Sequence, residues 1–432
     1  MKKILALALC ACMVLAMAAC GAKTETPATT EAPTTEAATT EAPTTEETAS
    51  QEELDKVAAD HVAELIDDIY VQTRNENTDQ QCLDAKAAWD ALTDAQKELV
   101  EGEEASPEYF GLDTGDASKD DPRNQDDIGE KELLVVSFGT SFNDSRAEDI
   151  KGIEDALAEA FPDWAVRRAF TAQIIINHIQ ARDGEKIDNM EQAMERAVAN
   201  GVKELLVQPT HLMHGAEYDE MMETLEAYKD KFDSIKVAEP MLGEVGSDAT
   251  VINADKEAVA KAVVEAALAE AGFESTDKAA EAGTAFVFMG HGTAHVAKVT
   301  YSQMQTQMEK LGYKNVFIGT VEGEPEETAC ENIIEAVAAA GYKNVVLRPL
   351  MVVAGDRGDD HAFLAIQSVL DVGDVQVLNS LNGAQAGNLA VHIFELTGGQ
   401  EHGLPGILLV TGHVVVGMVT GNHHQGTQNH IL

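Results

Sequence analysis

A histidine set between two glycines is the residue whose surroundings point most directly to chemistry. The run from Val287 to His295 reads VFMGHGTAH, so an apolar, strand-like segment leads directly into Gly290, His291 and Gly292. Open α/β sheets bind ligands beyond the carboxyl ends of their strands, where glycine lets the backbone approach a ligand closely. A neutral imidazole can accept a proton near neutral pH and can bind borderline divalent metals. We therefore expect His291 to face a ligand; the alternative is an ordinary loop.

The elements that would position this histidine begin near Lys131, where short apolar runs start to alternate with longer segments. The longer segments have the length of helices, and strands that alternate with helices form a parallel sheet covered on both faces. The sequence therefore predicts an α/β fold. The predicted strands lie at 133–137, 202–208, 285–289, 316–318 and 345–347, and the predicted helices at 146–161, 190–199 and 256–271.

Two halves of this part of the chain resemble each other. We therefore expect two similar lobes, each with a parallel sheet flanked by helices, and a cleft between them. In the sequence comparison Phe138 and Gly139 stand where the second half has Gly290 and His291, so the halves differ chemically. The similar pairs, in the same order along the chain, are 134–140 (LVVSFGT) with 286–293 (FVFMGHGT) and 201–209 (GVKELLVQP) with 341–349 (GYKNVVLRP).

The first 20 residues have the pattern of a secretion signal. A basic start is followed by an apolar run that is too short to cross a membrane as a mature helix, and the run ends at Cys20. A cysteine at such a cleavage site resembles a bacterial lipoprotein box. We expect an exported protein, lipid-anchored through Cys20 on the outer face of the cytoplasmic membrane or periplasmic, that does not span the membrane.

Composition divides the remaining chain into further segments. The spacing of Leu54, Val62 and Ile69 predicts an amphipathic helix, and Thr78 and Thr93, each followed three residues later by glutamine, predict capping boxes for two more. The predicted segments are a signal peptide at 1–20, a disordered Thr/Glu/Pro tether at 21–50, a helical module at 51–110, a linker at 111–130, the two-lobed part at 131–356 and a divergent segment at 357–432.

Charge and cysteine usage exclude two classes of protein. The formal net charge is −45, which argues against nucleic acid as a partner because phosphate contacts need Lys and Arg. Cys10 and Cys12 leave with the predicted signal and Cys20 is the predicted lipid attachment site. Cys82 and Cys330 remain, in different predicted domains, so no disulfide framework is expected.

Six segments, taken in order, resemble the anaerobic sirohydrochlorin cobaltochelatases, the class II chelatases of the cobalamin pathway. The resemblance covers roughly Glu132 to Asp356, and the ordered set is far more specific than any single motif. It implies a bilobal fold with a tetrapyrrole in the central cleft and a divalent metal held by histidine and carboxylate. The segments are 135–141 (VVSFGTS), 167–171 (RRAFT), 208–218 (QPTHLMHGAEY), 289–292 (MGHG), 319–323 (GTVEG) and 349–356 (PLMVVAGD).

Insertion of Co²⁺ into a tetrapyrrole needs a base beside a metal site, because two pyrrole protons leave while the metal sheds its water. We expect His291 to serve as base and metal ligand, and Glu322 to add a carboxylate ligand. For Glu322 a solvated helix start is the alternative, because acidic residues are favoured there. The same ligand set accepts Ni²⁺ or Fe²⁺ in place of Co²⁺.

Other polar residues of the matching segments are candidates for substrate contacts. His211 and Glu217 are expected to line the cleft, with one or the other helping in proton transfer. The alternative is that these polar residues belong to a loop and cap a helix, which we favour for His214. His295, four residues after His291, is left open as a second chelating residue.

The substrate carries several carboxylates, and arginine suits carboxylates well. Arg168 is therefore the predicted substrate-binding arginine. A surface ion pair is the alternative for Arg168 and equally for Arg146, Arg167 and Arg348.

One departure from the family pattern falls at Arg357, where the family has a histidine that acts as a second imidazole ligand. His361, four residues later, is the predicted substitute in the metal site. From residue 358 to 432 the chain has no Lys or Arg, yet this stretch holds seven of its 13 histidines. The C-terminal segment is therefore either divergent or misread.

The leading hypothesis is a lipid-anchored sirohydrochlorin cobaltochelatase that inserts Co²⁺ into a tetrapyrrole in cobalamin biosynthesis. The alternative is a non-catalytic cell-surface protein of the same fold, which binds a tetrapyrrole (haem or a corrinoid) or a metal. The expected partners are the tetrapyrrole, the divalent metal and the membrane, and a homo-oligomer is left open.

Overall fold

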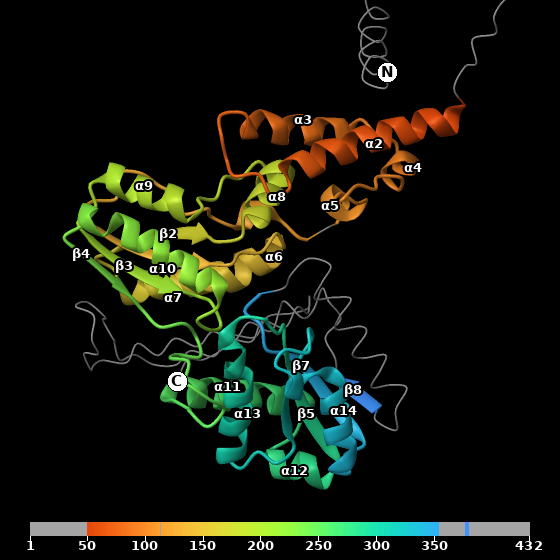
Figure 1. The fold of residues 1–432 in the computed structure, drawn as a ribbon, viewed down its shortest axis with the longest axis vertical. Coiled ribbons are helices and arrows are strands. Elements are labelled where there is room, and N and C mark those ends of the chain that lie inside the picture. Colours follow the sequence, from red (N-terminus) through yellow and green to blue (C-terminus); the bar gives the residue numbers. More distant parts are fainter. Residues whose placement is uncertain (1–49, 113, 354–375, 380–432) are drawn as a thin grey trace, which may run out of the picture. The chain divides into compact units, whose positions relative to one another are not determined.

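Two four-stranded parallel sheets form the larger part of the protein (Figure 1). The computed structural model describes residues 50–112, 114–353 and 376–379. Helices flank each sheet, so the predicted α/β fold with two similar lobes is confirmed.

The first lobe is built on a sheet with the strand order β2-β1-β3-β4. All its pairs are parallel, and Leu134 of the central strand β1 lies between Arg167 of β2 and Val207 of β3. Residues 132–137 are buried throughout, as expected of a strand covered on both faces. The elements are β1 (Lys131–Ser137), α6 (Asn143–Ser145), η2 (Arg146–Ile150), α7 (Lys151–Ala160), β2 (Ala165–Phe170), α8 (Gln173–Asp183), α9 (Met190–Asn200), β3 (Glu204–Pro209), α10 (Ala216–Tyr228), η3 (Lys229–Lys231) and β4 (Ser234–Val237).

The second lobe is built on a sheet with the order β6-β5-β7-β8. Val287 of the central strand β5 lies between Phe317 of β6 and Leu347 of β7, and every residue of β5 is buried. The elements are α11 (Ala254–Ala271), α12 (Thr276–Glu281), β5 (Thr284–Gly290), η4 (Val296–Lys298), α13 (Val299–Lys310), β6 (Val316–Thr320), η5 (Glu326–Thr328), α14 (Cys330–Ala339), β7 (Asn344–Pro349) and β8 (Gln376–Asn379).

The structure shifts the predicted alignment of the two halves by one residue. Lys131 of β1 pairs with Glu204, and Thr284 of β5 pairs with Asn344, at the same place in each sheet. Counting forward from these pairs sets Phe138 opposite His291 rather than opposite Gly290. The sequence comparison misplaced them because the second motif has one more residue before its final glycine.

An N-terminal helical part precedes the lobes, as predicted. Ser50 and Glu53 form a reciprocal capping box at the start of α2, and the box predicted at Thr93 is confirmed. The box predicted at Thr78 is wrong, because Asn77 precedes α3 and the hydroxyl of Thr78 accepts the N–H of Asn75. The elements are α2 (Gln51–Ile69), α3 (Thr78–Asp90), α4 (Asp94–Lys97), α5 (Glu108–Gly111) and η1 (Ala117–Lys119).

Helix α8 joins this helical part to the first lobe. The Asn177 amide donates to the carbonyls of Ile69 at 2.7 Å and Gln72 at 2.8 Å, at the end of α2. The His178 ring stacks on Tyr109, with ring centroids 4.4 Å apart. Residues 175–181 are all buried, so α8 is covered by the helical part as well as by its own lobe.

Several sequence predictions lie outside the described residues. They are the signal peptide, the tether up to residue 49, Cys20, Arg357, His361 and most of the segment 357–432. Within the described ranges, no helix has the length and hydropathy needed to cross a membrane.

Candidate functional site

A cavity of about 1170 Å³ lies where the central strands of both lobes end. Segments that follow β1, β3, β5 and β7 line it, together with the start of α8 and the segment that leads into α5. Parallel sheets bind their ligands at this edge, so the cavity is the candidate site. The lining segments that follow the four strands include 137–140, 210–213, 291–293 and 350–353.

The structure brings the predicted residues His291 and Glu322 together in this cavity. Nδ1 of His291 lies 3.3 Å from Oε1 of Glu322, and the backbone N–H of Glu322 donates to the His291 carbonyl at 2.9 Å. The two side chains are 54% and 48% exposed, so a ligand can reach both. An imidazole beside a carboxylate forms two ligands of a divalent metal site.

A different steric constraint requires glycine at each of the two positions beside His291. A Cβ at Gly290 would collide with the ring of Tyr301, which packs directly against the strand end. Gly292 has a φ of +96°, and a Cβ there would lie 3.0 Å from Cβ of Glu322. Gly292 therefore supplies the left-handed turn and the close approach that bring Glu322 to His291.

Tyr301 packs beneath His291 and the two glycines. Its ring is buried, and its hydroxyl accepts the N–H of Gly292 at 3.3 Å. Burial raises the pKa of Tyr301 to about 12, so the hydroxyl stays protonated at neutral pH.

His211 reaches the same cavity from the first lobe. Its Nε2 lies 3.5 Å from the hydroxyl of Thr171, while its buried Nδ1 has no hydrogen-bond partner among the described residues. Burial lowers the pKa of His211 to about 4, so the ring is neutral at neutral pH. Glu217 also lines the cavity. The structure thus places both predicted proton-transfer residues beside the His291 site.

The other two histidines have partners away from the cavity lining. His214 lies 2.8 Å from Glu239 and stacks on Tyr218, which agrees with the loop role favoured for it. His295 accepts the N–H of Ala297 through Nδ1, so it caps the short helix η4. It does not join His291 as a chelating pair.

The prediction that Arg168 binds the substrate is wrong, because its side chain does not reach the cavity. It is completely buried, with Nε donating to Glu154 at 2.7 Å and a terminal nitrogen donating to Asp120 at 2.7 Å. Both carboxylates are themselves buried, so the guanidinium is neutralised inside the first lobe. Its predicted role in substrate binding is therefore withdrawn.

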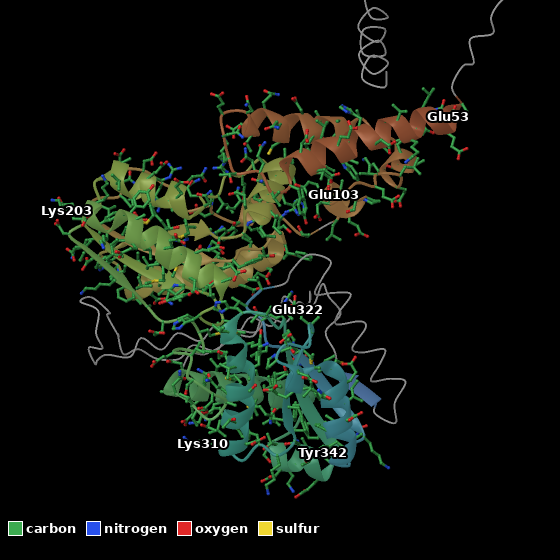
Figure 2. The ribbon with its side chains drawn as sticks, viewed as in Figure 1. Glu53, Glu103, Lys203, Lys310, Glu322 and Tyr342 are labelled. Atoms are coloured by element: carbon green, nitrogen blue, oxygen red, sulfur yellow. The ribbon has the colours of Figure 1, made fainter. Side chains whose placement is uncertain are left out.

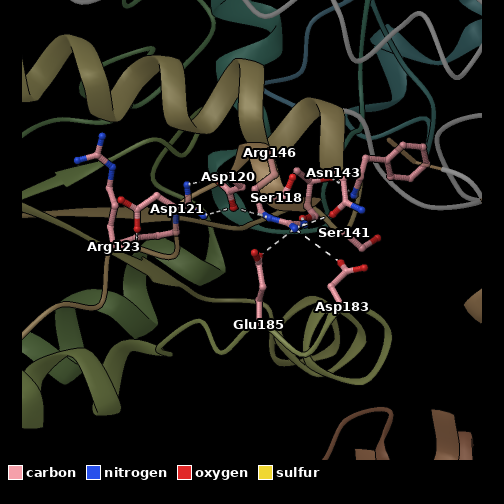
Figure 3. Close-up of polar contacts among 12 residues, drawn as sticks. Ser118, Asp120, Asp121, Arg123, Ser141, Asn143, Arg146, Asp183 and Glu185 are labelled. Atoms are coloured by element: carbon pink, nitrogen blue, oxygen red, sulfur yellow. Dashed lines mark hydrogen bonds and ion pairs between the residues drawn. The ribbon is translucent and has the colours of Figure 1, made fainter. Parts of the chain in front are cut away.

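The remaining predicted arginines are also internal. Figure 3 shows Arg146, whose guanidinium contacts Asp120 at 2.7 Å and Glu185 at 3.3 Å. Arg167 contacts Asp188 at 3.0 Å, and Arg348 contacts Glu270 at 2.9 Å. Asp120 belongs to the predicted linker, which is therefore packed against the first lobe.

Within the described ranges, no three His, Cys, Asp or Glu side chains are grouped to hold a metal ion. The His291 and Glu322 pair could supply only part of a ligand set there. His361, the predicted further ligand, lies outside the described residues.

Sequence reasoning missed two parts of the cavity wall. Phe138, 44% exposed, lines it at the position equivalent to His291, and apolar residues such as Ile174 and Leu350 extend the surface. The corrected duplication register would have found Phe138. The second part is the glutamate-rich segment 98–108 of the helical part. No sequence signal points to it, because it is placed by the packing of α3 and the end of α2 on α8.

The model of the cobalt chelatase (CbiK) family matches residues 131–365. The protein belongs to this family. The match includes both central strands and the His291 and Glu322 site, so the family predicted from the sequence is confirmed.

Two cobalt chelatases are each similar to about half of this chain. The sirohydrochlorin cobaltochelatase of Salmonella typhimurium is 30% identical over 226 residues, which cover 52% of this chain and 77% of that protein. The sirohydrochlorin cobaltochelatase CbiKC of Nitratidesulfovibrio vulgaris is 28% identical over 236 residues, covering 54% and 76%. Among solved structures, SirB from Bacillus subtilis with Fe3+ aligns with a TM-score of 0.40 and 12% identity, covering 57% of this chain and 87% of SirB.

Proposed function

We propose that the protein inserts Co²⁺ into sirohydrochlorin, a step of cobalamin biosynthesis. The His291 and Glu322 pair carries the proposal, because it presents an imidazole nitrogen and a carboxylate to a cavity at the strand ends. Membership of the cobalt chelatase family supports cobalt as the substrate metal. The names of the two similar cobaltochelatases support sirohydrochlorin as the substrate tetrapyrrole.

The reaction exchanges two protons for one metal ion. Two pyrrole N–H bonds break, the nitrogens bind Co²⁺, and two protons must find acceptors. His291 and Glu322 would hold the incoming ion, and the imidazole of His291 would take one proton as the ion leaves it. Glu217 on the same lining would take the other, because burial lowers the pKa of His211 to about 4 and so makes its ring a weak base.

The cavity wall around this pair suits the face of a macrocycle. Phe138 and Ile174 come from the first lobe and Leu350 from the second, and all three line the cavity. Apolar and aromatic side chains bind a flat, conjugated ring through its faces. The ring would lie against these residues with its central nitrogens turned toward His291.

Incubation of the purified protein with sirohydrochlorin and Co²⁺ tests the proposal through the absorbance change of the macrocycle. We expect a rate well above that of the protein-free mixture, and parallel runs with Ni²⁺ and Fe²⁺ give the metal preference. A rate equal to the spontaneous one, with the tetrapyrrole still bound, would contradict the enzyme.

A second candidate is a protein that binds a tetrapyrrole or metal without catalysis. The lining charge favours it: among the described residues that line the cavity there is no Lys or Arg, whereas Glu217 and Glu322 are joined there by the glutamates of 98–108. The carboxylates of sirohydrochlorin meet no opposite charge on this wall. Titration with haem and with sirohydrochlorin, followed by absorbance, would favour this candidate if haem binds more tightly and no metal is inserted.

We further propose that the protein is exported and lipid-anchored through Cys20. The basic start, the short apolar run and the cysteine at its end support this address. Replacing Cys20 with Ala should release the protein from the membrane fraction and abolish incorporation of labelled fatty acid. Retention of both in the variant would contradict the anchor.

A further inference from the structure

The first turn of α13 lies against both segments that carry the proposed metal ligands. Tyr301, on this turn, lines the cavity and is only 3% exposed. Figure 2 shows Glu322 and Lys310, the last residue of α13, toward opposite ends of the second lobe. The helix therefore begins on the side of the site, where its first residues can hold the backbone around His291 and Glu322.

Tyr301 fixes the segment that carries His291. Its hydroxyl accepts the buried backbone N–H of Gly292 at 3.3 Å, and its ring occupies the space that a Cβ at Gly290 would need. The carbonyl of His291, in the same segment, accepts the N–H of Glu322 at 2.9 Å. A shift of Gly292 would therefore move the two ligands relative to each other.

Ser302, the next residue of the helix, fixes the segment that carries Glu322. Its buried hydroxyl donates to Oε1 of Glu327 at 2.6 Å, and a hydrogen bond to a carboxylate is among the stronger ones. The two ends of this segment are also joined, because the hydroxyls of Thr320 and Thr328 lie 2.8 Å apart. The loop that includes Glu322 is therefore closed at its base and tied to α13 at Glu327.

A second tyrosine separates the packing of the Tyr301 ring from the role of its hydroxyl. Tyr313 is half-buried against the same hydrophobic core and does not line the cavity. Phenylalanine would fill the place of either ring, so the core does not require the hydroxyl of Tyr301. That hydroxyl serves the N–H of Gly292, and a buried N–H left without a partner costs about 1–3 kcal/mol.

We propose that Tyr301 and Ser302 are positioning residues, which set the imidazole of His291 and the carboxylate of Glu322 at the separation that a divalent metal needs. Neither binds the metal; each holds, through its hydroxyl, one of the two segments that carry the ligands. Replacing a residue that orients a metal ligand typically lowers metal affinity about 10- to 100-fold. The purpose of this role rests on the proposed metal insertion, but its effect is on the binding of Co²⁺ itself.

Titration of the full chain with Co²⁺, followed by calorimetry and by the visible absorption of the bound ion, tests the proposal. Tyr301→Phe keeps the ring and removes one hydroxyl, and Ser302→Ala removes the other. The first matched control is Tyr313→Phe, the same change on the same core. The second is Ser247→Ala, which removes a hydroxyl that also contacts a carboxylate, that of Asp248 at 3.2 Å, outside the cavity lining.

We expect Tyr301→Phe to bind Co²⁺ roughly 10-fold more weakly than the wild type, Ser302→Ala about 3-fold more weakly, and both controls to stay within about 2-fold. The visible spectrum of bound Co²⁺ depends on the geometry of its ligands, so it should change in the two variants and not in the controls. A purely structural role for the hydroxyls would lower the free energy of unfolding and leave this spectrum unchanged.

Wild-type affinity and spectrum in both variants would overturn the inference, even where the protein inserts cobalt. Equal losses in variants and controls, or no Co²⁺ binding by the wild type, would overturn it as well. If Tyr301→Phe does not fold, Ser302→Ala decides alone by the same two measurements. Co²⁺ binding that depends on the two hydroxyls, without cobalt insertion, would uphold the inference and contradict the enzyme.

Discussion

The two lobes share one backbone frame and carry opposite chemistry at its edge. In the second lobe the carbonyl of His291 accepts the N–H of Glu322 at 2.9 Å; in the first, the carbonyl of Phe138 accepts the N–H of Ala172 at 3.2 Å. An imidazole and a carboxylate in one lobe therefore correspond to an aromatic ring and a methyl group in the other. Under the proposed function, the second lobe would hold the metal and the first would contact an apolar surface.

The glycine after each of these residues shows what the frame itself requires. Gly139 has a φ of +101° and Gly292 a φ of +96°, so both lobes turn through the left-handed region at the same step. Both lobes have this turn, but the residue before it is Phe138 in the first lobe and His291 in the second. The two lobes therefore differ at this step in their side chains and not in their backbone turn.

The largest expected effect comes from His291→Ala. Loss of the imidazole removes a metal ligand and a proton acceptor, so we expect cobalt insertion to fall by roughly 10² to 10⁴-fold. The first-lobe counterpart Phe138→Ala should leave the maximal rate within a few fold and weaken tetrapyrrole binding instead. Absorbance kinetics at varied sirohydrochlorin separate the two. Equal losses of rate would contradict the division of labour between the lobes.

Next in size is the cost of removing a buried arginine. Arg168→Met leaves the buried carboxylates of Glu154 and Asp120 without their cation, which should lower the free energy of unfolding by about 3–5 kcal/mol. Arg348→Met in the second lobe leaves Glu270, whose side chain is 27% exposed, and should cost less. Urea denaturation measures both. A larger loss for Arg348→Met would reverse this contrast.

The pH dependence of stability should carry a contribution from His211. Its pKa is about 4 in the folded protein and about 6.5 when unfolded, so the unfolded chain gains a proton first as the pH falls. The contribution of His211 to the free energy of unfolding is fully present above pH 6.5. It is lost as the pH falls toward 4, by at most about 3 kcal/mol. His211→Gln should flatten this decline, and His61→Gln, at an exposed position of α2, should not. Denaturation midpoints across this range give the answer.

The smallest effect is expected from Gly292→Ala. The left-handed backbone disfavours alanine by about 1–2 kcal/mol, and the new Cβ would push on Glu322. Gly184→Ala, with a φ of +74° and open space around it, carries only the backbone cost. We expect similar losses of stability in both, but weaker Co²⁺ binding only at Gly292. Unchanged Co²⁺ affinity in Gly292→Ala would show that this turn does not position Glu322.

The sequence predicts the strands that contain an uninterrupted run of three or more apolar residues, and it fails where charged residues break that run. β1, β3, β5, β6 and β7 were predicted, whereas β2 was missed because its sequence AVRRAF places two arginines in the core. Nothing near Arg167 and Arg168 in the sequence shows that they are buried, because the carboxylates that neutralise them come from distant segments. β4 and β8, four residues each, are too short to give a period.

The same limit applies to the site. His291 and Glu322 were predicted because each follows an apolar strand, which places them at one sheet edge. The glutamates of 98–108 were not, because their place depends on how α3 and the end of α2 pack on α8.

The coverage of α8 has a consequence for shortening the chain. The cobalt chelatase match starts at residue 131, but the first lobe draws on residues before it. A chain truncated at Lys131 would lose Asp120, which pairs with Arg146 and Arg168, and would expose the polar and apolar side chains of α8 that now face the helical part. The unit that folds therefore begins some 80 residues before the unit that sequence comparison delimits. We therefore expect a chain truncated at the family boundary to be less stable than one that starts at residue 50.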